Sequence, residues 1–380
     1  MFPTRTDVLI AGAGPVGLAT AAHLRGQGYS VTVVDQQAEG VNTSRAAVVH
    51  PRTMEALDEI GVTGRLSALS LHSHGFTIRD RDRVLVPLRF DGVPSRYRNL
   101  FMVPQSDTER VLLERLLELG GTVLRPHTVT GMVQDGTGVT VTVDDRHHIR
   151  ARYLVGADGM HSTVRELAGI GFGEDHGGET FTLADVRATG VLPADEVVLF
   201  FSTGGMVVSA PLPDGTFRIV AEVADPPEEP DAAYIQDLLD RRGPAGGVRV
   251  EEVVWGSRFR VHHRIADRFR AGRVLLAGDA AHVHSPAGGQ GMNLGLRDAI
   301  ALGTALGAVL GGAPEDRLDR YAATQRPLAR TVVRFARVLT TLATAGPRVR
   351  PLRNALLRLL AQLPAFRNRL AKRLAGLSDR

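Results

Sequence analysis

The stretch from Asp7 to Asp35 constrains the fold of this chain more than any other. It reads DVLIAGAGPVGLATAAHLRGQGYSVTVVD. A short apolar run at residues 8–10 predicts a strand, a helical pattern follows as far as Gly28, and a second apolar run at residues 31–34 ends at Asp35. This order predicts one strand–helix–strand unit of a parallel sheet.

Three glycines between the first strand and the helix have the spacing G-x-G-x-x-G. Gly12 permits a tight turn, Gly14 lets a pyrophosphate approach the backbone, and Gly17 lets the helix pack closely on the strand. The phosphates would lie over the N–H groups at the start of the helix. Asp35 is placed to accept from the two hydroxyls of an adenosine ribose. The alternative is a glycine-rich turn that binds nothing. The pattern favours a dinucleotide but does not say which one.

Composition narrows the chemistry. The chain has 380 residues, enough for two or three domains, and it contains no cysteine. Structural disulfides, thiolate metal sites, thiol nucleophiles and dithiol redox centres are therefore excluded. Any redox chemistry must depend on a bound cofactor.

The net charge of +4 is unevenly distributed. Residues 347–380 hold nine basic side chains against one acid, Asp379, so the preceding chain is net negative. A basic body that would bind nucleic acid is absent. No secretory pattern precedes the first strand, and the longest apolar stretch, Ala299–Leu310, is too short to span a bilayer. We expect a cytoplasmic protein.

Two later segments repeat the pattern of an apolar strand that runs into a glycine turn. Residues 153–159 end in Asp158-Gly159, and a helix opens near Ser162. Residues 272–279 end in Gly278-Asp279, and a run of small residues at 285–293 precedes a helix to Leu310. Such small residues let a planar ring lie against the backbone, with the positive end of the helix directed at it.

The rest of the chain has a different pattern. Residues 71–103 contain strand-like segments, residues 105–120 an amphipathic helix, and residues 172–263 a series of hairpins. We predict an α/β protein, with a three-layer Rossmann-like dinucleotide-binding domain, an interleaved antiparallel-sheet substrate domain and a C-terminal helical segment. The predicted boundaries are 1–70, 104–170 and 264–316 for the first domain, 71–103 and 171–263 for the second, and 317–380 for the C-terminal helices.

With these three motifs in order, the sequence resembles the FAD-dependent aromatic hydroxylases, the single-component flavoprotein monooxygenases with the para-hydroxybenzoate hydroxylase fold. The resemblance covers about residues 5–345. Asp35 stands where a glutamate is commoner in that family. The resemblance implies that Asp35 holds the adenosine ribose, Asp279 the ribityl chain, and Gly288–Asn293 the isoalloxazine. It also implies that Arg45 and Gln105 contact the FAD, and that Arg165 supports the segment around Asp158. The full set of cofactor-binding residues implied is Gly12, Gly14, Pro15, Gly17, Asp35, Arg45, Gln105, Asp158, Gly278, Asp279, Pro286, Gly288, Gly291, Met292 and Asn293.

The resemblance also implies the reaction. NAD(P)H would reduce FAD, the reduced flavin would add O2 as a C4a-hydroperoxide, and one oxygen atom would pass to an aromatic ring. The apolar strands at 197–208 favour a hydrophobic, phenolic or polycyclic substrate, although strand alternation turns about half of these side chains to the core. No catalytic side chain is singled out. His282 and His284 form a His-x-His pair, but no third ligand of obvious type lies nearby, and we expect no metal.

Other functions use the same motifs. A flavin-dependent halogenase needs a catalytic lysine, and the only lysine here is Lys372, in the tail. A flavoprotein that epoxidises or desaturates a lipid, and a flavin-binding protein without turnover, remain open. The tail, with leucines at helical spacing and arginines opposite, would pack on the FAD domain, mediate oligomerisation, or lie on an anionic membrane or acidic carrier protein.

Overall fold

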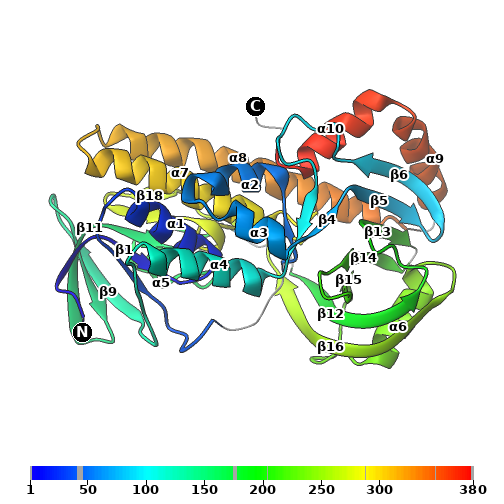
Figure 1. Ribbon diagram of the computed structural model, residues 1–380, viewed down its shortest axis with the longest axis horizontal. Helices are drawn as coiled ribbons and strands as arrows, with labels where there is room; N and C mark the ends of the chain where they lie inside the picture. The colour runs from blue at the N-terminus through cyan, green and yellow to red at the C-terminus, as the bar shows by residue number, and fades with distance from the viewer. Residues whose placement is uncertain are drawn as a thin grey trace.

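The computed structural model describes residues 2–40, 46–173, 178–202, 204–286, 288–346 and 348–377. One half of the molecule is built on an eight-stranded sheet with the order β18-β19-β11-β1-β2-β8, to which β10 and β9 are joined through β11 (Figure 1). Its strands are β1 (Arg5–Ala11), β2 (Val31–Val34), β8 (Val123–Leu124), β9 (Val129–Gln134), β10 (Val139–Val143), β11 (His147–Gly156), β18 (Arg270–Ala271) and β19 (Val274–Leu276).

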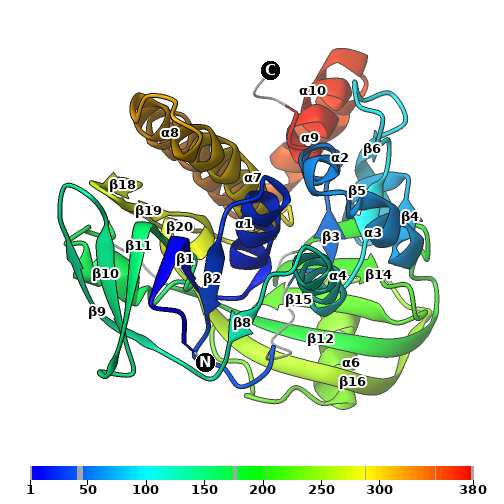
Figure 2. The same cartoon turned by 60° about the vertical axis from the view of Figure 1, so that its left-hand side comes forward.

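The middle of this sheet is parallel and buried on both faces. β1 pairs in parallel with β2 and β11, and β11 pairs in parallel with β19. Val8, Leu9 and Ile10 of β1 are fully buried, because helices lie on one face and the β9–β10 hairpin on the other (Figure 2). The covering helices are α1 (Pro15–Gly26), α4 (Gln105–Glu118) and α7 (Gly291–Leu310). The three-layer α/β architecture is as predicted.

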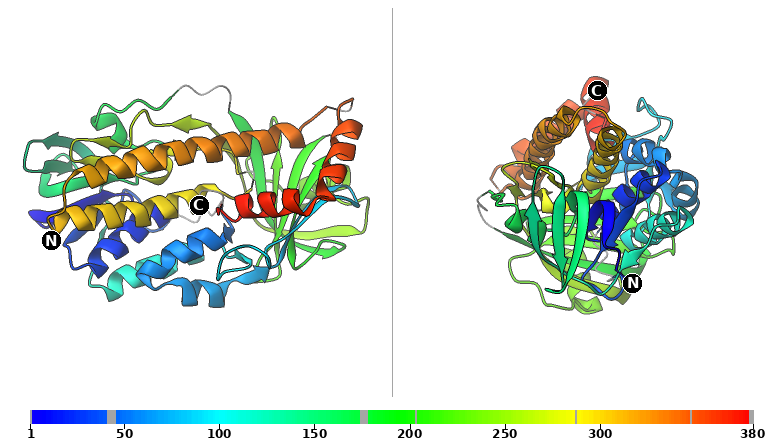
Figure 3. Two further views of the ribbon diagram at one scale, coloured as in Figure 1. Left: turned by 90° about the horizontal axis from the view of Figure 1, so that it is seen from above. Right: turned by 90° about the vertical axis from the view of Figure 1, so that its left-hand side faces the viewer.

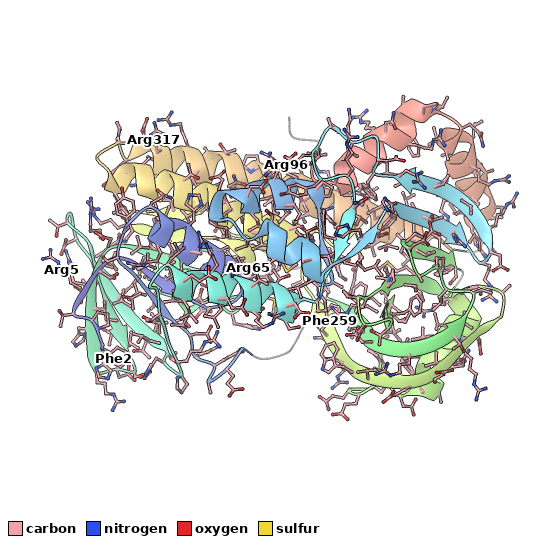
Figure 4. The ribbon with its side chains drawn as sticks, viewed as in Figure 1. Phe2, Arg5, Arg65, Arg96, Phe259 and Arg317 are labelled. Carbon is pink, nitrogen blue, oxygen red and sulfur yellow. The ribbon has the colours of Figure 1, made fainter. Side chains whose placement is uncertain are left out.

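The other half is built on a seven-stranded, largely antiparallel sheet with the order β16-β12-β15-β14-β13-β5-β6. Among the described strands of this sheet, only β13 and β5 pair in parallel. The strands are β5 (Gly75–Asp80), β6 (Arg83–Arg89), β12 (Glu179–Gly190), β13 (Glu196–Ser202), β14 (Gly205–Pro211), β15 (Phe217–Glu222) and β16 (Val248–Val261). Figure 4 places Phe259 of β16 where this sheet meets the first half, and its ring stacks on Phe181 with centroids 5.6 Å apart.

Strand alternation divides this sheet between two cores. Val198 and Phe200 pack in the cluster beneath α6 (Ala232–Arg242). Val197, Leu199 and Phe201 of the same strand pack on the opposite face, which we call the inner face. The predicted division of the apolar strand side chains between two faces is therefore present. Helix α6 was not predicted, although Asp231 caps it and its apolar residues have helical spacing.

Small elements connect the two halves. Residues 71–103 do not all enter the antiparallel sheet, because β4 (Leu71–Ser73) and β7 (Leu100–Met102) form a separate three-stranded sheet with β3 (Val48–Val49). The remaining short elements are α2 (Pro51–Leu57), η1 (Asp58–Ile60), α3 (Thr63–Leu69), α5 (Thr163–Leu167), η2 (Gly278–Ala280) and the β17 (Arg264–Ile265)–β20 (His282–Val283) pair.

The C-terminal segment is helical, as predicted. α8 (Asp316–Ala343) runs along the molecule and continues through Pro327, and α9 (Arg350–Ala361) and α10 (Pro364–Leu374) follow at the end of the antiparallel sheet (Figure 3). α9 and α10 pack chiefly against β6, and the end of the tail also contacts the FAD domain, where the backbone N–H of Arg52 donates to the carbonyl oxygen of Ala375 at 3.2 Å. Within the described residues no helix is both long and apolar enough to cross a membrane.

Candidate functional site

The turn between β1 and α1 is tightly packed on one side. Gly12 has a φ of +99°, and a Cβ there would lie 2.2 Å from the carbonyl oxygen of Ala157, at the end of β11. A Cβ on Gly17 would lie 1.9 Å from the carbonyl oxygen of Gly12. Such distances are far inside van der Waals contact, so the fold itself requires these two glycines.

The other side of the same turn is open. A Cβ built on Gly14 would meet no atom within 4 Å, and its φ of −74° is one that any residue adopts. Gly14 is the N-cap of α1 and Pro15 opens the helix. The first turn of a helix leaves backbone N–H groups without intrahelical partners, and the helix dipole is positive there. This open side of the turn has the room and the backbone N–H groups that a pyrophosphate requires, and binding of a pyrophosphate here stays a prediction.

Asp35 lies at the end of β2 and fastens the turn. Its carboxylate accepts hydrogen bonds from the backbone N–H of Ala13 at 2.6 Å and of Gln37 at 2.8 Å. Asp35 therefore fixes the backbone of the glycine turn. Each of its carboxylate oxygens can still accept a further hydrogen bond from a ribose hydroxyl. Binding of the ribose stays a prediction.

Arg125, which follows β8, lies near the same end of the sheet and was not singled out from the sequence. It donates to the carbonyl oxygen of Ala13 at 3.3 Å, and its buried Nε has no partner. Glu109 of α4 lies close by, and burial raises its pKa despite the hydrogen bond from Gln105 and the charge of Arg125. Arg125 thus has an unused N–H donor beside the glycine turn, and this group is suited to donate a hydrogen bond to a phosphate or ribose oxygen.

Gln105 and Arg45 were both predicted to contact the FAD. Gln105 begins α4, and its backbone N–H donates to the carbonyl oxygen of Ala46 at 3.1 Å. Its side-chain oxygen accepts from the backbone N–H of Ala46 at 3.4 Å. Arg45 lies outside the described residues. Gln105 is thus joined to the residue that follows Arg45 in the chain.

The second glycine turn, after β11, is organised by Asp158. Its carboxylate accepts from the Ser162 hydroxyl at 2.5 Å and from the backbone N–H of Val164 at 3.1 Å. Ser162 in turn caps α5 by accepting from the backbone N–H of Arg165 at 3.0 Å. Burial raises the pKa of Asp158, although these hydrogen bonds oppose the shift.

Arg165 links the second turn to the third. Its buried guanidinium donates to the carbonyl oxygens of Met160 at 2.9 Å and Ala280 at 3.1 Å. It also stacks over Phe172, 3.9 Å from the ring centroid. A buried arginine with fixed carbonyl partners makes the two turns, more than one hundred residues apart, one rigid unit.

In the third turn, Gly278 packs against the start of α1, next to the first glycine turn, and Asp279 is exposed at the surface. Gly278 has a φ of +62°, and a Cβ on it would lie 2.7 Å from a methyl of Val16 in α1. The buried Asp298 accepts from the backbone N–H of Gly278 at 3.3 Å and lies 2.5 Å from Nε2 of His282. Burial alone would lower the pKa of His282, but the charge of Asp298 outweighs it and leaves that pKa above its ordinary value.

The glycine-rich loop 286–291 continues from the third turn into α7. The carbonyl oxygen of Pro286 accepts from the backbone N–H of Gly289 at 2.9 Å, and Gly288 and Gly289 have φ values of +84° and +62°. Gly291 opens α7, and a Cβ on it would meet nothing within 4 Å. Met292 is partly buried and packs against the core of the first half.

Asn293 fixes this loop to the segment that follows Arg45 in sequence. Its amide nitrogen donates to the carbonyl oxygens of Val48 at 2.9 Å and Gly289 at 2.8 Å. Its amide oxygen accepts from the backbone N–H of His50 at 2.7 Å. Asn293 therefore positions backbone of β3 and of the loop, with both its amide nitrogen and its amide oxygen engaged in hydrogen bonds.

Sequence reasoning also missed a buried ion pair on the inner face. Arg218 of β15 forms a two-pronged contact with Asp185 of β12, both hydrogen bonds being 2.7 Å, and donates to the carbonyl oxygen of Ala46 at 2.9 Å. The side chain of Arg218 is 3% exposed. The pair joins the antiparallel sheet to the segment beside Gln105.

Two histidine side chains, His263 and His284, lie close together just before the glycine-rich loop. Nδ1 of His284 is 2.8 Å from the carbonyl oxygen of Ser285, so Nδ1 carries the proton and Nε2 presents a lone pair. That Nε2 is buried and has no partner, and burial lowers the pKa of His284 to about 4. His263 lies close enough to act on it, and Nε2 of His263 is 3.6 Å from Glu179. No group of three or more histidine, aspartate or glutamate side chains suited to a metal occurs among the described residues.

Comparison with known proteins agrees with this geometry. A family model described as "FAD binding domain" matches residues 5–336. The chain is 39% identical over 380 residues to a 12-dehydrotetracycline 5-monooxygenase/anhydrotetracycline 6-monooxygenase of Streptomyces rimosus, covering 94% of this chain and 73% of that one. The chain belongs to the FAD-dependent aromatic hydroxylases.

Other members of the family support the same assignment. Pentachlorophenol 4-monooxygenase of Sphingobium chlorophenolicum is 32% identical over 345 residues, covering 86% of this hydroxylase and 63% of that enzyme. The structure of p-nitrophenol 4-monooxygenase from Pseudomonas putida superposes with a TM-score of 0.87 at 26% identity, covering 100% of both chains. This hydroxylase is therefore a flavoprotein monooxygenase with FAD as its cofactor.

The contrast between Gly12 and Gly14 gives a test of this predicted pyrophosphate site. In the Gly14→Ala variant we expect the free energy of unfolding to change by less than about 0.5 kcal/mol, because the added methyl meets no protein atom. We expect its FAD affinity to fall about tenfold or more, because the methyl occupies the space assigned to the pyrophosphate. Urea unfolding of the apoprotein and quenching of FAD fluorescence measure the two quantities.

The matched control is Gly12→Ala. Its methyl would overlap the carbonyl of Ala157, so this variant should lose both stability and FAD binding. If Gly14→Ala binds FAD as tightly as the unaltered chain, the pyrophosphate does not lie at this turn.

Proposed function

We propose that this hydroxylase uses NAD(P)H and O2 to hydroxylate a hydrophobic aromatic substrate, held between the inner face of the antiparallel sheet and the glycine-rich loop. The observation that carries the proposal is the convergence of three turns from distant parts of the chain beside that inner face. Relatives include enzymes named for anhydrotetracycline, rifampicin and pentachlorophenol, all of which contain aromatic rings. We therefore place the substrate of this chain in the class of apolar phenols and fused-ring aromatics.

FAD, when bound, supplies the redox chemistry: it accepts a hydride from NAD(P)H and activates O2, and one oxygen atom enters the ring while the other leaves as water. The protein binds and orients the cofactor and the substrate, and it excludes water from them. Gly12, Gly14 and Asp35 hold the adenosine end, together with Arg125. The loop from Gly288 to Asn293 forms a backbone surface for the isoalloxazine. The N-terminus of α7 places its positive dipole beside that surface.

The inner face of the sheet excludes water from the reacting ring. Its apolar side chains come from all seven strands of the sheet and from the helices packed against them. They include Phe181 and Leu183 of β12, Leu199 and Phe201 of β13, and Met206 of β14. An apolar wall of this kind favours a substrate with large ring area, since each buried aromatic ring removes much apolar surface from water.

His284 is our candidate for the group that receives the phenolic hydroxyl. Its Nε2 is a buried lone pair without a partner, in the residue two positions before Pro286. A neutral imidazole can accept a hydrogen bond from the hydroxyl of a phenol. This raises the electron density on the phenol oxygen and in the phenol ring, which makes that ring a better nucleophile toward an electrophilic oxygen.

The experiment that tests the proposed function is a screen for substrate-stimulated NAD(P)H oxidation by the FAD-loaded protein. The screen covers simple phenols, quinones and fused-ring phenols such as anhydrotetracycline, with the product mass determined for each. We expect at least one aromatic compound to raise the oxidation rate about tenfold and to gain 16 mass units. A product lighter by two mass units would identify a desaturase, and FAD binding without any stimulated oxidation would identify a protein without turnover.

Replacement of His284 tests its role. In His284→Phe we expect binding of the phenol found in the screen to weaken tenfold to a hundredfold, because the hydroxyl loses a buried acceptor. Hydrogen peroxide should form at the expense of product. His148→Phe, on the exposed surface of β11, is the control. Unchanged phenol affinity and coupling in His284→Phe would remove His284 from the site without affecting the proposed reaction.

A further inference from the structure

Helix α9 exposes a row of large apolar side chains, although Leu357 and Ala361 pack inward. Five large apolar side chains along it are exposed: Val349 by 56%, Leu352 by 72%, Leu356 by 51%, Leu359 by 68% and Leu363 by 55%. Their spacing of three or four residues places them in one stripe, which we call the leucine stripe. Soluble proteins rarely expose contiguous apolar surface of this kind without a binding role.

The opposite side of α9 is anchored by polar groups. The buried Arg353 donates to the carbonyl oxygen of Leu342 at 2.7 Å and of Ala343 at 3.3 Å, at the end of α8. Its guanidinium lies 5.0 Å from the ring centroid of Phe201. Asn354 and Arg350 both hydrogen-bond to Asp80, at the end of β5. These bonds prevent the helix from turning its leucines inward, so the stripe is a fixed feature of the surface.

The charge around the stripe is of one sign. Residues 348–377 contain eight arginine or lysine side chains and no aspartate or glutamate. Arg350 and Arg353 are engaged in the anchors described above. Among the described residues, Arg358, Arg367 and Arg369 make no ion pair with a carboxylate. The stripe therefore lies in a segment of net positive charge whose exposed cations are available to an anionic partner.

The shape of the molecule leaves the stripe accessible. α9 lies at one end of the long axis, at the far end from β9 and β10 (Figures 1 and 3). A second copy of the chain docked stripe to stripe would bring two sets of unpaired arginines together, which is unfavourable. The stripe presents a handful of residues, whereas a standard protein interface uses about 20–30 on each side.

We propose that the leucine stripe of α9 docks on the surface of an anionic lipid bilayer, with the leucines at the boundary of headgroups and acyl chains and the arginines on the phosphates. An amphipathic helix with a leucine face and cationic flanks binds in this way, and each Lys or Arg near an anionic leaflet adds to the attraction. The long arginine side chains reach the headgroups while the leucines stay in the apolar layer. Apolar aromatic compounds also partition into bilayers, so a docked enzyme would meet such substrates at high local concentration. This last point rests on the proposed function, whereas the docking itself does not.

The test is co-sedimentation of the FAD-loaded protein with vesicles of phosphatidylglycerol mixed with phosphatidylcholine, compared with phosphatidylcholine alone. We expect binding to the anionic vesicles at least tenfold stronger than to the neutral ones, and a steep loss of binding between about 0.05 and 0.5 M salt. In the Leu356→Gln/Leu359→Gln variant the partition coefficient should fall more than tenfold. The same vesicle comparison works on the unaltered chain, so the result does not depend on the folding of the variant.

Val133→Gln is the matched control, because Val133 of β9 is 74% exposed and lies at the opposite end of the molecule. It should bind the anionic vesicles as the unaltered chain does. No sedimentation with anionic vesicles at low salt would overturn the proposal, as would equal binding to neutral ones. A dimer in light scattering that the double variant converts to monomers, or saturable binding of the stripe to an acidic carrier protein without vesicle binding, would also overturn it. A negative result here leaves FAD binding and hydroxylation untouched, since those are measured without lipid.

Discussion

The contact on which the rest of the structure depends is the one between Gly12 and the carbonyl of Ala157. It brings the ends of β1 and β11 so close that no side chain fits between them. Parallel neighbouring strands end at the same edge of a sheet, so the turns that follow them are forced together. The third turn joins the same edge because β19 pairs with β11, and Gly278 then packs on Val16 of α1. Three segments far apart in the chain thereby become one wall.

Polar ties turn that wall into a fixed site. Arg165 joins the second turn to the third through Ala280, and Asn293 joins the glycine-rich loop to β3 through Val48. Arg218 joins the antiparallel sheet to the segment before β3 by donating a hydrogen bond to the carbonyl oxygen of Ala46. Each tie ends on backbone carbonyl groups, so it fixes main-chain position independently of neighbouring side chains. A cofactor that is gripped by backbone amides and carbonyls requires this kind of rigidity.

Much of this arrangement could be predicted from the sequence because its signals are local. The turns Gly12–Gly17, Asp158-Gly159 and Gly278-Asp279 each follow an apolar strand directly, and short-range pattern was enough to place them. The ties could not be predicted, because Arg218 and Ala46 are 172 residues apart and Asn293 and Val48 are 245 apart. The same limit explains the tail. Its helical spacing was clear, but which side of α9 faces inward is decided by Asp80 and by the last carbonyls of α8. Ligand roles for Asp35, Gln105 and Asp279 remain predictions.

The central claim is that this wall binds one FAD. Equilibrium dialysis of the purified protein against FAD, with the flavin content measured by its absorbance after the protein is denatured, tests it directly. The account predicts about one FAD per chain at saturation, with none bound by the Gly12→Ala variant. A preparation that is colourless and takes up no flavin at micromolar FAD would contradict the account.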